Sequence, residues 1–93
     1  MGKYKIALTD RAKTHLSEWK KSGQLITLKK IARIFIELSN TPFVGIGSPE
    51  PLKYNLTKYW SRQIDKKNRI IYQVKEEEVT VFIVSTKGHY GDK

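Results

Sequence analysis

Residues 59–86 read YWSRQIDKKNRIIYQVKEEEVTVFIVST, and this stretch decides the fold. It holds three segments rich in β-branched and aromatic residues, over 59–64, 69–75 and 79–86. Such composition favours strands. The turn-prone residues DKKN separate the first two segments, and three consecutive glutamates separate the last two. The spacing therefore predicts antiparallel strands joined by short hairpins.

The residues just before this stretch predict a loop. Positions 42–51 read PFVGIGSPEP and contain all three prolines of the chain. Proline cannot donate a backbone hydrogen bond, so neither a helix nor a central strand can continue there. Gly45 and Gly47 are not accompanied by the lysine and the serine or threonine of a phosphate-binding loop, so they are interpreted as turn residues. A further short strand is expected near residues 52–56.

The N-terminal half predicts one strand and two helices. Residues 4–8 alternate apolar and polar side chains, as a half-buried strand does. A helix should begin after an N-cap at Thr9 or Asp10 and stop before Gly23. A second apolar stripe runs through 28–38, and that helix should end near Asn40, because Pro42 disfavours helical geometry before it.

This order of elements predicts a single α+β domain over residues 1–93. The simplest way for the two N-terminal helices to bury both apolar stripes is to pack against one face of a small, mostly antiparallel sheet. The other face of the sheet is then free to present polar side chains to an extended ligand.

The charge predicts a polyanionic partner. The chain has 18 basic and 9 acidic side chains, a formal net charge of +9. A field of this sign attracts nucleic acid and speeds the encounter with it. A membrane surface is a weaker candidate, since the basic residues are spread over both halves of the chain.

Several function classes are excluded or disfavoured by composition. The chain has no cysteine, so disulfides, thiolate metal sites and a cysteine nucleophile are excluded. Two distant histidines and no carboxylate cluster outside the 76–78 turn argue against a bound metal. No segment predicts a membrane span or a signal peptide, so the expected location is the cytoplasm.

Three side chains stand out as candidates for chemistry. Glu50 lies between two prolines that restrict its backbone, Arg69 opens a predicted strand, and His89 follows the last strand. His15, inside the first helix, is expected at an ordinary surface or boundary position. Each candidate alone also fits a plain surface residue.

Together, these three types of side chain suit RNA cleavage by the substrate's own 2′-hydroxyl. A carboxylate takes the hydroxyl proton, a guanidinium stabilises charge on the phosphoryl oxygens, and an imidazole protonates the departing 5′-oxygen. DNA lacks the hydroxyl and could not be a substrate.

The second half of the chain resembles the YoeB (Txe) family of toxins, within the RelE/ParE superfamily. The resemblance rests on an ordered series of short motifs: TPFVGIGSPEPLK at 41–53, NL at 55–56, YWSR at 59–62, NRIIY at 68–72 and HY at 89–90. The series is more specific than any one of its members. The first half agrees only in its pattern of strand and helices.

The resemblance implies a RelE/ParE-like fold and a ribosome-dependent endoribonuclease that cuts mRNA in the ribosomal A site without a cofactor. It implies that Glu50 is the general base, Arg69 the transition-state phosphate ligand and His89 the general acid. Lys53, Arg62 and Tyr90 match RNA-binding positions.

The same resemblance implies partners. These are the 70S ribosome, a YefM-like antitoxin and a second copy of the toxin in a homodimer. Operator DNA is an expected partner only of the toxin–antitoxin complex, which would repress its own operon. No membrane partner is expected.

Two positions depart from the family's pattern. Gln63 stands where a second arginine is common, and residues 91–93 follow the His-Tyr pair that often ends the chain. Both differences from the family pattern bear on the rate of RNA cleavage and on the preferred cut site. The alternatives are a non-hydrolytic ParE-like toxin that inhibits DNA gyrase, which would not need Glu50 and His89, and a plain RNA-binding domain.

Overall fold

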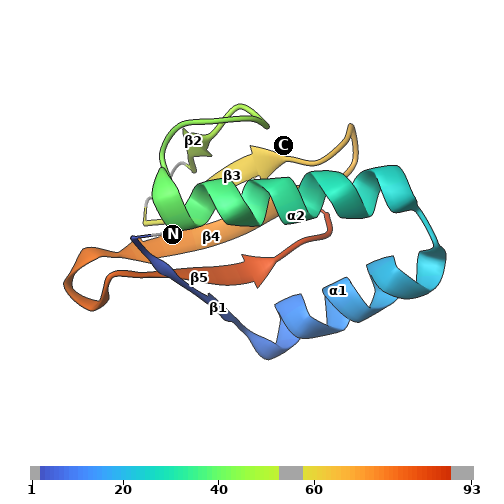
Figure 1. The fold of residues 1–93 in the computed structure, drawn as a ribbon, viewed down its shortest axis with the longest axis horizontal. Helices are drawn as coiled ribbons and strands as arrows, with labels where there is room; N and C mark the ends of the chain where they lie inside the picture. The colour runs from blue at the N-terminus through green and yellow to red at the C-terminus, as the bar shows by residue number, and fades with distance from the viewer. Residues whose placement is uncertain (1–2, 53–57, 89–93) are drawn as a thin grey trace.

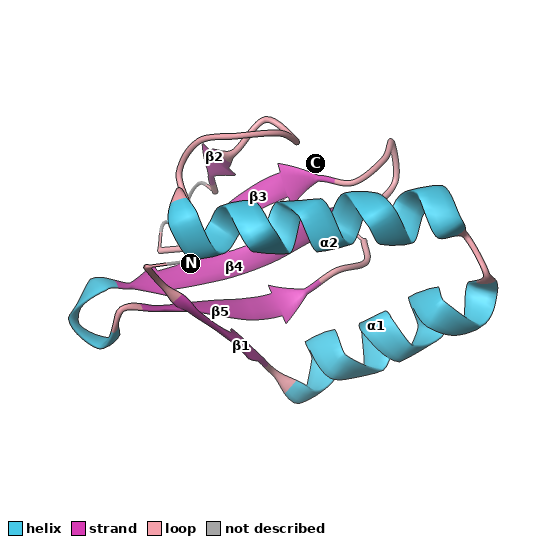
Figure 2. Ribbon diagram, viewed as in Figure 1, coloured by secondary structure: helices cyan, strands magenta, loops and turns pink. Residues whose placement is uncertain are grey.

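The computed structural model of the chain describes residues 3–52 and 58–88. Figure 1 shows two helices lying together against a twisted sheet, and Figure 2 separates the helices from the strands by colour. In chain order the elements are β1 (Lys5–Leu8), α1 (Asp10–Ser22), α2 (Leu25–Asn40), β2 (Glu50–Pro51), β3 (Trp60–Gln63), β4 (Arg69–Lys75), a 3₁₀ turn (Glu76–Glu78) and β5 (Thr80–Ser85).

The sheet has five strands in the order β1-β5-β4-β3-β2. The predicted hairpins are confirmed, because β3 pairs with β4 and β4 with β5 in antiparallel fashion. The first strand runs parallel to the last, with Lys5 opposite Thr80. The expected α+β architecture with a mostly antiparallel sheet is confirmed.

The two helices begin and end where their local signals place them. Thr9 caps α1 by accepting a hydrogen bond from the Ala12 N–H at 3.2 Å. Gly23 ends that helix with a left-handed φ of 71°, a conformation that costs glycine little. In the part of the chain that the structure describes, neither helix is long and apolar enough to cross a membrane.

The core lies between the helices and one face of the sheet. It contains Ala12 and Trp19 of α1, Ile34 and Leu38 of α2, and the sheet residues Ile70, Tyr72, Val81 and Ile83. Because side chains alternate along a strand, Ile71 points to the opposite face. Trp60 and Arg62 pair with Tyr72 and Ile70, so they lie on the helix side of β3. Ser61, between them, lies on the opposite side.

The short strand of the proline-rich region differs from expectation. It was expected near residues 52–56, but β2 comprises Glu50–Pro51, which pair with Ser61 and Trp60. Residues 53–57 lie outside the described part of the chain. Proline is compatible with this position because β2 is an edge strand, where a missing N–H removes no hydrogen bond from the sheet.

Candidate active site

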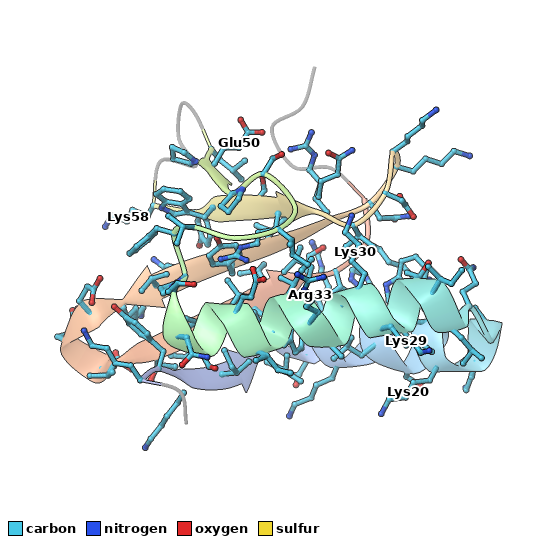
Figure 3. The ribbon with its side chains drawn as sticks, turned by 45° about the horizontal axis from the view of Figure 1, so that its top comes forward. Lys20, Lys29, Lys30, Arg33, Glu50 and Lys58 are labelled. Carbon is cyan, nitrogen blue, oxygen red and sulfur yellow. The ribbon has the colours of Figure 1, made fainter. Side chains whose placement is uncertain are left out.

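Glu50 and Arg69 meet on the sheet face that the helices leave uncovered. Glu50 Oε1 lies 3.0 Å from Arg69 Nη1. The sheet register explains the meeting, since Glu50 pairs with Ser61 and Ser61 pairs with Ile71, two residues after Arg69. Figure 3 shows the Glu50 side chain on β2, pointing away from α2. The sequence expectation that these two side chains converge is consistent with this geometry.

The pair is partly open to solvent. The Glu50 side chain is 57% exposed and that of Arg69 is 25% exposed. Arg69 Nη1 also donates to Ser61 Oγ at 3.4 Å, and Ser61 is fully buried. Arg69 Nε is buried and has no hydrogen-bond partner within the described residues. The guanidinium thus retains an unused donor beside an accessible carboxylate.

The backbone of Arg69 is held by the segment that follows β5. Its N–H donates to the Gly88 carbonyl at 3.1 Å, and the Gly88 N–H donates to Asn68 Oδ1 at 3.0 Å. Gly88 has a φ of 80°, in the region that favours glycine. Gly88 directly precedes His89 in the sequence. His89 itself lies outside the described residues, as do Lys53 and Tyr90.

The turn before Arg69 is fixed by Asp65. Its Oδ1 accepts hydrogen bonds from the backbone N–H groups of Lys67 at 2.8 Å and Asn68 at 2.7 Å. Burial alone would raise the pKa of Asp65, but these hydrogen bonds outweigh it and lower that pKa. The carboxylate therefore stays ionised and keeps the β3–β4 turn in one conformation.

Arg62 has a different environment from the one expected. Its side chain is fully buried on the helix side of β3, where Nη1 lies 2.7 Å from Glu37 Oε1. A guanidinium with no exposed surface does not contact an RNA phosphate in this conformation. The sequence pattern could not reveal this, because the partner carboxylate comes from α2, far away along the chain.

Two cavities lie elsewhere on the described part of the chain. One of about 480 Å³ is lined by residues that include Phe43, Trp60 and Lys75. Another, of about 390 Å³, lies between α2 and the proline-rich loop and is lined by Lys29, Lys30, Arg33, Ile46 and Gly47. The second cavity is rich in cations.

No metal centre is evident in the described part of the chain. Within residues 3–52 and 58–88 there is no group of three or more histidine, cysteine, aspartate and glutamate side chains that could hold an ion. The chemistry available at the site is that of a carboxylate, a guanidinium and a buried hydroxyl.

Comparisons with known proteins match this arrangement. A Toxin YoeB from Streptomyces coelicolor is 35% identical over 92% of this chain and 99% of its own. A YoeB/ParE toxin from Agrobacterium tumefaciens has a similar structure, with a TM-score of 0.85 and 29% identity over 92% of this chain and 99% of that one.

Two solved structures from Staphylococcus aureus also match. One is a YoeB dimer with a TM-score of 0.77 and 31% identity, covering 95% of this chain and 99% of that one. The other is a heterotetrameric YoeB–YefM toxin–antitoxin complex with a TM-score of 0.75 and 32% identity, covering 94% and 98%. The family model for the YoeB-like toxin of bacterial type II toxin–antitoxin systems matches residues 8–90, and the chain belongs to that family.

Proposed function

We propose that this toxin is a ribosome-dependent endoribonuclease that cuts mRNA in the ribosomal A site and so inhibits translation. The observation that carries the proposal is the 3.0 Å contact between Glu50 and Arg69, whose side chains are 57% and 25% exposed. A proton acceptor and a phosphate-binding cation at hydrogen-bonding distance from each other suit attack by a 2′-hydroxyl on the adjacent phosphodiester.

In the proposed reaction, Glu50 accepts the proton of the ribose 2′-hydroxyl as its oxygen attacks phosphorus. Arg69 stabilises the negative charge on the non-bridging oxygens. The bond from phosphorus to the 5′-oxygen breaks, and His89 donates a proton to that oxygen. The products are a 2′,3′-cyclic phosphate and a 5′-hydroxyl. The reaction uses no metal or cofactor.

The ribosome's part in this proposal follows from the weakness of a carboxylate as a base. A carboxylic acid has a pKa far below that of a ribose hydroxyl, so proton removal is slow unless the reactants are held in line. Bound mRNA in the A site provides that orientation. The cation-lined cavity of Lys29, Lys30 and Arg33 supports docking to structured RNA.

Further RNA contacts are proposed for Lys53 and Tyr90. No such role is proposed for Arg62, whose side chain is buried.

The proposed partners follow from the family. We expect a YefM-like antitoxin to neutralise the toxin, as the Staphylococcus aureus complex pairs YoeB with YefM. We also expect a toxin homodimer, repression of the toxin's own operon by the toxin–antitoxin complex, and action in the cytoplasm, where the ribosomes are.

Primer extension on a translated mRNA with purified ribosomes tests the proposal. The native chain should create new 3′ ends at A-site codons. Arg69→Ala and His89→Ala should abolish them, and Glu50→Gln should leave only slow residual cutting. Glu77→Gln and Lys66→Ala, which alter exposed charges outside the site, are the matched controls and should cut normally.

Undiminished cutting by the three site variants would refute the residue assignment. Equally fast cutting of free RNA would remove the ribosome from the mechanism. Inhibition of DNA gyrase without any RNA cleavage would favour the ParE-like alternative.

A further inference from the structure

The buried guanidinium of Arg62 is the centre of a hydrogen-bond cluster that holds the loop from Thr41 to Gly47. Its Nη2 donates to the carbonyls of Thr41 and Val44, each at 2.8 Å. Its Nη1 donates to Glu37 Oε1 at 2.7 Å and to the Ile46 carbonyl at 3.5 Å. A loop carbonyl removed from water must find a donor, and a single side chain supplies three of them here.

Glu37 and Tyr72 complete the cluster. Glu37 Oε1 also accepts the Ile46 N–H at 2.9 Å, so it joins α2 to the loop. The Tyr72 hydroxyl accepts from Arg62 Nε at 3.4 Å and donates to the Pro42 carbonyl at 2.6 Å. Burial raises the pKa of Tyr72, although Arg62 opposes the shift, so the hydroxyl keeps its proton and its role as a donor. The loop is thus fixed from α2, β3 and β4 together.

Gly45 allows the loop to approach this cluster closely. Its φ is 135°, and a Cβ added there would overlap Glu37 Oε1 and lie 2.8 Å from Arg62 Nη1. The backbone therefore rests directly on the ion pair, without any side chain between them.

The loop leads straight into the strand that carries Glu50. The Gly47 carbonyl accepts the N–H of Gln63, the residue after Arg62, at 2.6 Å. Three residues after Gly47, β2 begins, with only Glu50 and Pro51 paired to β3. A strand of two residues has few contacts of its own to set its register, so its position depends on the loop that precedes it.

Strand β3 links the cluster to the site through neighbouring residues. Arg62 points to the helix side and holds the loop, while Ser61 points to the other side, opposite Glu50 and beside Arg69. Glu50 is therefore placed by contacts on both faces of the same strand.

We propose that Arg62 is a positioning residue of the cleavage site, which acts through the 41–47 loop to hold Glu50 opposite Arg69. This inference rests on the proposed function. Arg62 then holds the loop from inside the protein and does not make the RNA contact expected from the sequence. Glu37 and Tyr72 help to hold the same loop.

The test is single-turnover cleavage of ribosome-bound mRNA by Arg62→Lys. Lysine keeps the charge beside Glu37, but its single ammonium cannot reach all three loop carbonyls with the geometry of a planar fork. We expect cleavage to be roughly 30-fold slower, while affinity for the ribosome changes less than about 3-fold, because an altered Glu50 position affects the reaction and not docking. The variant should retain a single cooperative unfolding transition.

The matched control is Arg11→Lys, the same change of side chain at a distant position. Arg11 is an exposed residue in the first turn of α1, outside the Arg62 cluster and the cation-lined cavity. This variant should cleave within about 2-fold of the native rate, since an exposed substitution that keeps the charge has little effect.

A double-mutant cycle with Glu50→Gln separates positioning from general destabilisation. If Arg62 acts through Glu50, then Arg62→Lys should cause almost no additional loss when Glu50 is already Gln. A full 30-fold additional loss in that background would overturn the proposal, as would a native rate for Arg62→Lys alone. A native rate for Glu50→Gln alone would instead refute the proposed function.

If Arg62→Lys does not fold, the pair Glu37→Leu with Arg62→Met removes both charges together. Replacing a buried ion pair by apolar residues is generally tolerated far better than removing one partner. The folded double variant should still bind ribosomes and cleave at least about 30-fold more slowly, because the loop has lost its donors. A native cleavage rate in it would also overturn the proposal.

Discussion

The Asn68 side chain accepts a hydrogen bond from the backbone N–H of Gly88, at 3.0 Å, and so joins the start of β4 to the segment after β5. The same Gly88 accepts from the Arg69 N–H at 3.1 Å. The residue that precedes the proposed general acid in sequence is thus fixed beside the proposed phosphate ligand. This contact bears on the proposed catalysis because it fixes the residue before His89 next to Arg69.

Asn68→Ala should therefore slow cleavage by roughly 10-fold, because it removes one of the two hydrogen bonds that anchor Gly88. Loss of this hydrogen bond and of the contacts to Asp65 should lower the free energy of unfolding by about 1–2 kcal/mol. Chemical denaturation and single-turnover cleavage measure the two effects. Lys66→Ala, in the same turn, is the control, and an unchanged cleavage rate for Asn68→Ala would contradict the expectation.

Glu50→Gln should leave stability nearly unchanged. Its ion pair with Arg69 is more than half exposed on the carboxylate side, and such pairs contribute about 0–1 kcal/mol. The urea midpoint should stay close to the native value although cleavage is strongly slowed. A large drop in the midpoint would mean that Glu50 is mainly structural.

Gly45→Ala should be much more destabilising than Gly23→Ala. Both glycines have positive φ, but a Cβ at Gly23 meets nothing within 4 Å, whereas one at Gly45 would overlap the partly buried Glu37 carboxylate, which Arg62 holds in place. We expect about 1 kcal/mol for Gly23→Ala from backbone strain alone, and roughly 3 kcal/mol or more for Gly45→Ala. Thermal or urea unfolding of the two variants distinguishes these values, and equal losses would argue against the close approach.

Stability should fall as the pH drops below about 6.5, the ordinary value for histidine, because of His15. Burial lowers the pKa of His15, while Glu18 opposes this and Lys87 and Arg11 add to it. Its Nδ1 accepts the Thr86 N–H at 3.2 Å, which only the unprotonated nitrogen can do. Because the folded-state pKa is depressed, the unfolded chain binds the proton first, and folding stability is lost as the pH falls.

The variant His15→Gln tests this expectation, since its amide oxygen can accept the same hydrogen bond but does not titrate. Urea midpoints at pH 7.5 and 5.5 should differ less for His15→Gln than for the native chain. An identical pH dependence of the two proteins would show that another group is responsible.

The sequence predicted the strands and helices because their signals are local. Alternation over residues 4–8, the cap at Thr9 and the turn at Asp65 each act within a few residues, and the structure confirms all three. His15 also lies at the boundary position expected for it, half-buried beside β5.

What the sequence did not reveal depends on contacts between distant segments. The residues next to Arg62 in the sequence do not indicate that its side chain pairs with Glu37 of α2. The sequence therefore predicted an RNA-binding role for an arginine that is buried in the structure. The sequence also did not indicate the strand at Glu50–Pro51, because it is defined by pairing with Ser61 and Trp60 of β3 and not by strand propensity. The meeting of Glu50 with Arg69 requires β3 between them, which only the sheet order provides.

The parallel pairing of β1 with β5 has a consequence for folding. Lys5 lies opposite Thr80, although both helices and three other strands separate them along the chain. A contact between such distant residues forms slowly, because a long loop must close before the pairing contributes any stability. Strand β1 can therefore join the sheet only after β5 has been synthesised.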